Sequence, residues 1–131
     1  MKYPFLSIII PTLNNEKDLP LLFSSLNKQV YPKDKLEIIV SDGGSKDSTK
    51  NIAKKNNALV IHNTKVLAEP GVELGMKKAK GELLMILAVD NIFEEEDSLK
   101  KIASCFSDSH IYAAFPRHES NNSDTLFTKY I

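Results

Sequence analysis

The sequence predicts an α/β fold in which a mostly parallel sheet carries helices on both faces. Strand and helix patterns alternate along the chain in the order β-α-β-α-β-α-β-α-β. The strand patterns are continuous apolar runs, which are typical of parallel strands buried on both faces. The 131 residues, of which 42% are hydrophobic, suffice for one domain with a substantial core. We therefore expect a single domain over residues 1–131, with a core over 1–115 followed by a polar loop and an apolar C-terminal stub over 116–131.

Five short apolar runs bounded by turn residues account for the predicted strands. They cover residues 5–10, 36–40, 58–61, 83–87 and 111–115. The first run ends at Pro11, and loops rich in Gly, Asn, Asp and Ser follow most of the others.

Apolar residues at helical spacing predict a helix after each of the first four strands. The first follows the N-cap candidates Asn14 and Asn15 and carries apolar residues up to Val30. The second covers residues 47–56. The third begins at Pro70 and ends at Gly81, an arrangement typical of helix termini. The fourth begins near residue 94 and carries apolar residues up to position 106.

Composition excludes several functional classes. The chain has 17 basic and 17 acidic residues, whereas a nucleic-acid-binding protein needs a basic excess. The longest apolar run has seven residues, 83–89, far fewer than the roughly 18 that a membrane span requires. The N-terminus lacks the pattern of a signal peptide. The single cysteine, Cys105, lies in an apolar helical stripe and is expected to be buried. We expect a cytoplasmic location, with a peripheral position at the inner membrane face as the alternative.

Ligands of such sheets bind at the carboxyl ends of the strands, so the loops 11–16, 42–47, 62–69 and 88–93 are candidate binding loops. None contains the glycine pattern of a dinucleotide-binding fold or a P-loop. Receiver domains need acidic residues after the first strand, where this chain has Pro11 and Thr12.

Two of these loops place a carboxylate directly after an apolar strand. Asp42 precedes Gly43 and Gly44 and could accept hydrogen bonds from a base or ribose; a plain turn is the alternative. Asp90 follows the most apolar strand, where a carboxylate is costly unless it is solvated or holds a cation. Mg²⁺ or Mn²⁺ would suit it, with diphosphate oxygens completing the shell; a turn before the next helix is the alternative. Asp47 is best explained as a helix cap.

Four sequence blocks occur in a characteristic order. They are SIIIPTLNNE at 7–16, EIIVSDGGSKDST at 37–49, GMKKAKGE at 75–82 and ILAVDN at 86–91. Together they resemble the inverting glycosyltransferase family 2, which has the GT-A fold, over roughly residues 6–115. The resemblance implies a donor-binding portion of that fold, with the acceptor-binding half short or missing.

The resemblance also implies roles for individual residues. The implied nucleotide-sugar-binding set is Pro11, Thr12, Asn14, Glu16, Asp42, Gly43, Lys65 and Gly75. Within it, Asp42 would bond the base, most often uracil, and Gly75 would let the chain approach the donor closely. Lys65 would contact a phosphate, although a solvated surface role is the simpler interpretation. Asp90 matches the final Asp of the D-x-D motif and would hold the divalent metal.

The chain departs from the family pattern at three places. Ala88 stands where the first acidic residue of the metal motif is usual, and Glu73 stands where an Asn is usual. The catalytic base of the family lies beyond the fifth strand, and its identity here is unknown. His118 and Glu119 follow that strand, but nothing in the sequence fixes their geometry.

Three functions are consistent with these patterns. The first is a glycosyltransferase that uses a nucleotide-diphosphate sugar, UDP-sugar above all, and Mn²⁺ or Mg²⁺ to glycosylate a polysaccharide or lipid-linked acceptor. The second is a truncated or inactive module that binds the nucleotide sugar without transferring it. The third is an α/β interaction domain without a site. A homodimer is expected from the apolar stub residues Leu126, Phe127, Tyr130 and Ile131.

Overall fold

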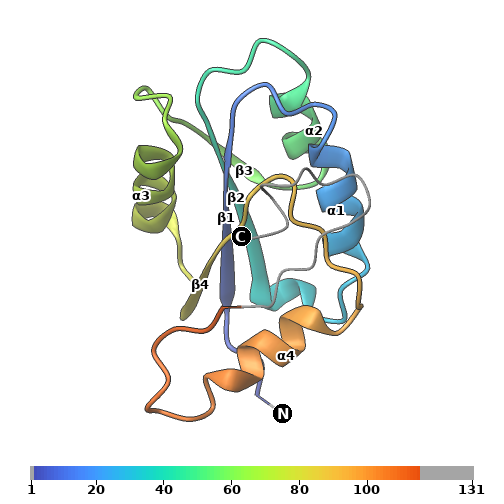
Figure 1. Ribbon diagram of the computed structural model, residues 1–131, viewed down its shortest axis with the longest axis vertical. Coiled ribbons are helices and arrows are strands. Elements are labelled where there is room, and N and C mark those ends of the chain that lie inside the picture. Colours follow the sequence, from blue (N-terminus) through green and yellow to red (C-terminus); the bar gives the residue numbers. More distant parts are fainter. Residues whose placement is uncertain (1, 116–131) are drawn as a thin grey trace, which may run out of the picture.

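Residues 2–115 are described by the computed structural model, and they form a four-stranded sheet with helices packed against it (Figure 1). The strands are β1 (Leu6–Thr12), β2 (Leu36–Asp42), β3 (Leu59–His62) and β4 (Leu83–Ile86). Their order across the sheet is β3-β2-β1-β4, and all three pairs are parallel. The predicted parallel α/β fold is confirmed, and the carboxyl ends of all the strands therefore lie at one edge.

The helices are α1 (Leu19–Asn27), the short 3-10 helix η1 (Lys33–Lys35), α2 (Thr49–Lys55), α3 (Ala68–Lys78) and α4 (Ser98–Cys105). Figure 1 shows α3 on one side of the sheet and α1 and α2 on the other. All four predicted helices are present; α1, α2 and α4 are shorter than expected, and α3 begins two residues before Pro70 and ends at Lys78. Among residues 2–115, no helix has the length and apolar character that crossing a bilayer requires.

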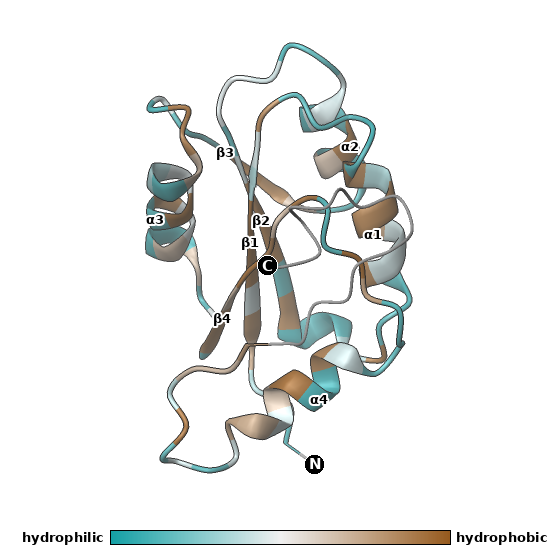
Figure 2. Ribbon diagram, viewed as in Figure 1, coloured by the Kyte–Doolittle hydropathy of each residue, from teal (hydrophilic) through white to brown (hydrophobic). Residues whose placement is uncertain are grey.

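The apolar run in β1 forms the centre of the core. Ile8 and Ile10 belong to the cluster that includes Phe23 of α1, whereas Ile9 points toward α3. All three isoleucines are fully buried. Because β1 is covered on both faces, it needs apolar residues at successive positions, as its sequence indicated. Figure 2 shows the complementary pattern, with hydrophilic residues in the loops beyond the strands.

Strand β1 continues past the proline that was expected to end it. Pro11 pairs with Ser41 of β2, and the strand ends at Thr12. The carbonyl oxygen of Ile9 accepts a hydrogen bond from the amide of Leu87, so this side of β1 faces β4. The missing amide of Pro11 points to the same side, beyond the last residue of β4, and therefore costs no ladder bond.

The predicted strand over residues 111–115 is wrong, because this segment pairs with no strand of the described part of the chain. It faces β4 across a cavity, so it gains neither ladder hydrogen bonds nor burial; Tyr112 and Phe115 are 89% and 92% exposed. Cys105 was also expected to be buried and is exposed at the end of α4. The stub residues 126–131 and the base candidates His118 and Glu119 lie outside the described residues.

Candidate functional site

The loops after β1 and β2 meet at the carboxyl edge of the sheet, at the top of Figure 1. Thr12 and Asp42 are register partners at the ends of the two strands. The buried Asp42 carboxylate accepts the Thr12 hydroxyl at 2.8 Å and the Ser45 hydroxyl at 2.5 Å on Oδ1. Its Oδ2 accepts the amides of Gly44 at 3.0 Å and Ser45 at 2.7 Å. Asp42 therefore shapes the turn that follows it.

Burial alone would raise the pKa of the Asp42 carboxyl, but the hydrogen bonds from Ser45, Thr12 and Gly44 outweigh it and lower this pKa. The four bonds occupy the four lone-pair sites of a carboxylate. A hydrogen bond donated by a base to the Asp42 carboxylate therefore stays a prediction, and it would require one of the four present donors to be released.

A set of hydrogen bonds between backbone amides and side chains connects the β1 and β2 loops. The pairs, amide first, are Asn14 with Ser45 Oγ at 2.8 Å, Asn15 with Thr49 Oγ1 at 2.8 Å, Glu16 with Asp47 Oδ2 at 3.2 Å, Lys46 with Asn14 Oδ1 at 2.8 Å, and Ser48 with Glu16 Oε2 at 3.0 Å. Asn14 has a φ of 52°, a left-handed conformation that asparagine tolerates better than most residues. The structure thus brings Pro11, Thr12, Asn14, Glu16, Asp42 and Gly43 together.

Asp47 was expected to be the N-cap of α2, but the N-cap is Ser48 and Asp47 lies one residue before it. Its Oδ1 accepts the amide of Thr49, the first residue of α2, at 2.9 Å, and also the Thr49 hydroxyl at 2.5 Å. These bonds lower the pKa of the Asp47 carboxyl. Asp47 therefore serves both the start of α2 and the connection to the β1 loop.

Gly43 lies where the β2 loop packs against the loop after β3. Its amide bonds the carbonyl oxygen of Thr12 at 2.8 Å. A Cβ at this position would lie 2.9 Å from the carbonyl oxygen of Val66, so only glycine fits here without backbone movement. Val66 itself has a φ of 68°, which is strained for a β-branched residue.

Asn63, which sequence reasoning missed, organises the loop that carries Lys65. This fully buried side chain donates to the carbonyl oxygen of Leu67 at 2.7 Å and accepts the amide of Lys65 at 3.1 Å. Its own amide bonds the carbonyl oxygen of Asp42 at 2.8 Å. An asparagine directly after an apolar strand was the only available signal. Lys65 is exposed, and its ammonium group forms none of the ion pairs between residues 2 and 115.

The structure places Gly75 against the sheet, away from the loops that gather at its carboxyl edge. A Cβ at Gly75 would lie 2.4 Å from Cγ2 of Ile9, so the glycine lets α3 approach β1 closely. Helix packing therefore accounts for this glycine, and its predicted approach to a donor stays untested. Glu73, where the family usually has Asn, pairs with Lys77 at 2.8 Å on the exposed side of α3.

Asp90 lies in a turn after β4. Between the strand and this turn, Leu87 still lies beside β1, because its amide donates to the carbonyl oxygen of Ile9. The Asn91 amide bonds the Ala88 carbonyl oxygen at 3.1 Å, and its side chain accepts the Ala88 amide at 3.1 Å. The turn that was the alternative interpretation is therefore present. Asp90 is exposed, and no hydrogen bond between residues 2 and 115 links its carboxylate to the other loops.

The donor set for a divalent ion is small. No group of three or more His, Cys, Asp or Glu side chains within the described residues could hold a metal ion. A free, exposed carboxylate nevertheless fits the way Mg²⁺ binds beside nucleotides, through one or two carboxylates, several waters and substrate phosphates. Asp90 could therefore hold such an ion together with a diphosphate.

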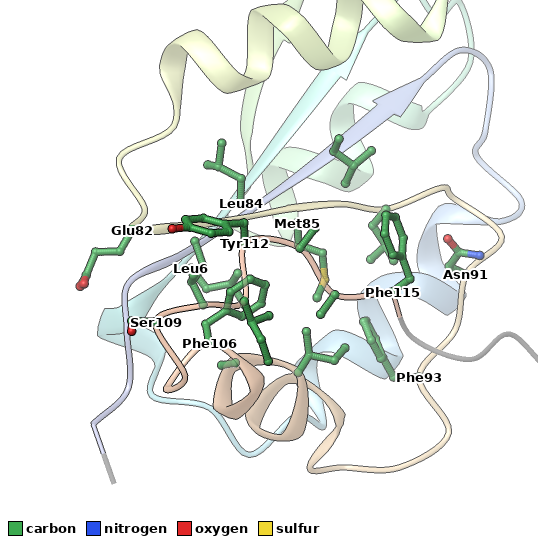
Figure 3. A pocket seen from close by; sticks show the side chains of 18 residues that line it. Leu6, Glu82, Leu84, Met85, Asn91, Phe93, Phe106, Ser109, Tyr112 and Phe115 are labelled. Carbon is green, nitrogen blue, oxygen red and sulfur yellow. The ribbon is translucent and has the colours of Figure 1, made fainter.

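The large cavity of the described structure, about 770 Å³, lies elsewhere (Figure 3). It lies between β4, α4 and the segment 109–115, and its lining is mostly apolar, including Leu6, Met85, Phe93, Phe106, Tyr112 and Phe115. None of the predicted nucleotide-binding residues lines it. We therefore place the candidate site at the polar loops.

Comparison with known proteins identifies the family. The profile described as glycosyl transferase family 2 matches residues 7–130. The chain belongs to this family. TarS of Staphylococcus aureus, a poly(ribitol-phosphate) beta-N-acetylglucosaminyltransferase, is 33% identical over 110 residues, which are 79% of this chain and 19% of TarS. Glycosyltransferase AglE of Haloferax volcanii is 31% identical over 93 residues, 66% of this chain and 31% of AglE.

Solved structures of glycosyltransferases show the same architecture. Mannosyltransferase PcManGT from Pyrobaculum calidifontis, in complex with GDP-Man and Mn²⁺, matches with a TM-score of 0.74 at 25% identity, covering 82% of this chain and 33% of that one. TarS 1–349 with UDP-GlcNAc matches with a TM-score of 0.71 at 30% identity, covering 80% and 32%. The chain thus has a GT-A fold and spans a third or less of the length of these relatives.

Proposed function

We propose that this family 2 chain binds a nucleotide-diphosphate sugar, a UDP-sugar above all, at the carboxyl edge of β1, β2 and β3. Asp90 and a Mn²⁺ or Mg²⁺ ion would hold the diphosphate. The metal supplies Lewis-acid stabilisation of the leaving diphosphate when it is bound. The reaction served by this site is transfer of the sugar to a hydroxyl of a polysaccharide or lipid-linked acceptor.

The observation that carries the proposal is the connected pair of loops after β1 and β2. The Asp42 carboxylate and the amide bonds of Asn14, Asn15 and Glu16 connect both loops through groups of the protein itself. Loops that are held by internal hydrogen bonds lose less entropy when a small ligand binds, which favours affinity. The polar character of this edge suits a nucleoside and its ribose better than it suits an apolar ligand.

Charge at the edge supports the diphosphate assignment. Lys65 is exposed beside Val66, whose backbone touches the Gly43 position, and it can reach an anion bound there. Glu73 is paired with Lys77, so its charge opposes an anionic ligand less than the sequence suggested. TarS has been solved with UDP-GlcNAc and PcManGT with GDP-Man and Mn²⁺, which supports a nucleotide sugar and a divalent ion here.

A nucleotide-sugar-binding module without transferase activity is the second candidate. One observation favours it: Asp90 is the single carboxylate available in its turn. Incubation with sugar donors, Mn²⁺ and saccharide acceptors separates the two candidates. Release of nucleotide diphosphate with glycosylated product supports the transferase, and binding without product supports the module.

Thermal melting with UDP, GDP, CDP and ADP, each with Mn²⁺ or with a chelator, tests the binding proposal. A nucleotide at 100 times its dissociation constant adds about 2.7 kcal/mol, which raises the melting temperature of a domain of this size by several degrees. We expect a Mn²⁺-dependent shift with UDP. Asp90→Asn should abolish the Mn²⁺ dependence, whereas Asp34→Asn, an exposed carboxylate on η1, should leave it intact. No shift with any nucleotide would contradict the proposal.

A further inference from the structure

The loop between β3 and α3 contains a strained turn. The amide of Leu67 bonds the carbonyl oxygen of Lys65 at 2.8 Å, so these residues close a three-residue γ-turn around Val66. Because Val66 has a φ of 68°, this is the rare form of the γ-turn, which is strained, above all for a β-branched residue. Backbone strain of this kind clusters at ligand clamps and switch regions. Figure 1 shows the loop at the upper left, above α3.

The buried side chain of Asn63 holds the strained turn in place. Its Nδ2 donates to the carbonyl oxygen of Leu67 at 2.7 Å, and its Oδ1 accepts the amide of Lys65 at 3.1 Å. These two bonds fix the residues on either side of Val66. In this arrangement the carbonyl oxygen of Val66 lies 2.9 Å from the place where a Cβ on Gly43 would stand. The strained turn therefore packs the loop after β3 against the loop after β2, within the candidate site.

The hydroxyl of Ser41 points to a second arrangement of the Asn63 side chain. Ser41 is fully buried beneath α3, and its Oγ forms no hydrogen bond with any group of residues 2–115. A Cβ on Gly71 would lie 3.1 Å from this oxygen and 2.9 Å from Nδ2 of Asn63, so both polar groups adjoin the same small space. The Nδ2 group only donates, so it offers the hydroxyl proton of Ser41 no acceptor. Turning the amide over would place Oδ1 there as an acceptor and would break both bonds to the turn.

We infer that residues 63–67 form a two-state latch beside the nucleotide site, with the Asn63 amide as its switch. In the assembled state, which the structure shows, Asn63 bonds the strained turn and the loop packs against Gly43. In the relaxed state the amide is turned over toward Ser41, Val66 returns to a negative φ, and Lys65 leaves the carboxyl edge. The relaxed state loses two hydrogen bonds to the turn, but it gains one with Ser41 and loses the strain, so the two states are close in free energy.

The latch rests on the proposed function only for its ligand. A nucleotide diphosphate that contacts both Lys65 and the loop after β2 makes these contacts together in the assembled state alone. It therefore shifts the loop toward that state, because a ligand favours the conformation that it binds more tightly. The equilibrium between the two states of the free chain does not depend on any ligand, so it can be measured separately.

Amide hydrogen exchange of the whole chain, measured by NMR, tests the latch without a ligand. The amide of Leu67 is bonded in the assembled state, so its protection factor reports how often the turn opens. Val66→Gly should raise this factor about tenfold, because glycine adopts a positive φ without strain. Ser41→Ala should raise it several-fold, because the relaxed state loses its hydrogen bond. The matched control is Asn57→Gly, the same type of change at a φ of 59° in the turn before β3, which should leave Leu67 unchanged.

Either variant can overturn the latch. A Leu67 protection factor that Val66→Gly or Ser41→Ala leaves at the wild-type value would do so, since a hydroxyl with a merely structural role does not affect this amide. Adding UDP with Mn²⁺ to the wild type should raise the protection of Leu67 further. UDP that binds, as shown by thermal melting, without protecting Leu67 would overturn the latch as a nucleotide-dependent device. Absence of UDP binding would contradict the proposed function instead, while exchange in the free chain would still decide whether the two states exist.

Discussion

Replacing Asp42 provides the sharpest test of how the candidate site is built. Its carboxylate is 1% exposed and accepts four hydrogen bonds, two from hydroxyls and two from amides. Asp42→Ala leaves all four donors without their acceptor, and unsatisfied buried donors cost about 1–3 kcal/mol each before relaxation. Water entering the space and the relief of burying a charge offset part of this loss. We expect a net destabilisation of about 3–5 kcal/mol.

Asp42→Asn should be much milder. The amide oxygen can accept the backbone amides of Gly44 and Ser45, while its NH₂ group can donate to the hydroxyl oxygens of Thr12 and Ser45, which rotate to accept. Only the charge assistance is lost, about 1–2 kcal/mol. Urea unfolding monitored by circular dichroism should therefore rank the wild type above Asp42→Asn and Asp42→Ala last.

The stability gap between the wild type and Asp42→Asn also depends on pH. The folded-state pKa of Asp42 is lowered from its ordinary value of 3.8, so the ionised group contributes its full stability above that value. This contribution is lost as the pH falls through the folded pKa, whereas asparagine does not titrate. The gap should be constant from pH 7 to about pH 5 and should narrow below about pH 4. Equal destabilisation by Ala and Asn, or a gap that does not change down to pH 3, would refute the reasoning.

Two further substitutions test the packing that positions the site. Gly75→Ala should lower the free energy of unfolding by about 1–3 kcal/mol in urea titrations, because its Cβ would overlap Ile9 and push α3 off the sheet; an unchanged midpoint would contradict this. Gln29→Ala should cost about 2 kcal/mol and raise amide exchange in α4, since the buried Gln29 side chain bonds the carbonyl oxygen of Glu95 and the amide of Leu99. Unchanged exchange in α4 would show that other contacts hold this helix.

The parallel sheet was predictable because apolar strand runs alternate with helix patterns along the chain, and this alternation is typical of parallel sheets. The run in β1 needs burial on both faces, and a parallel sheet with helices on both sides provides that burial. The segment 111–115 has the same apolar pattern, but the prediction of a strand there was wrong. A strand needs hydrogen bonds from a neighbouring strand, and the sequence of the segment does not show whether such a partner is present. The prediction that Cys105 is buried was wrong for a similar reason. An apolar stripe on a helix is buried only where another element of the fold covers it.

The candidate site was predictable as a location more than as a set of contacts. Asp42 and Asn14 were expected at the carboxyl edge and are there. Their observed partners are Ser45 and Lys46, residues of the other loop or turn, and no spacing in the sequence encodes those bonds. Asn63 was missed because a buried asparagine that bonds its own loop has the same sequence signal as an exposed turn residue.

The position of the polar network limits what Asp42 can do in this family 2 chain. A carboxylate whose four lone-pair sites are filled from within the protein gains nothing by exchanging a good donor for a base N–H, because the released donor must then be satisfied again. In the proposed function, Asp42 would therefore act on a nucleotide by holding the β1 and β2 loops in one arrangement. Recognition would then fall to exposed groups at the same edge, such as the ammonium group of Lys65 and the carboxylate of Asp90. Buried hydrogen bonds thus fix the scaffold of the candidate site, whereas the proposed affinity for a diphosphate would depend on charges that remain in solvent.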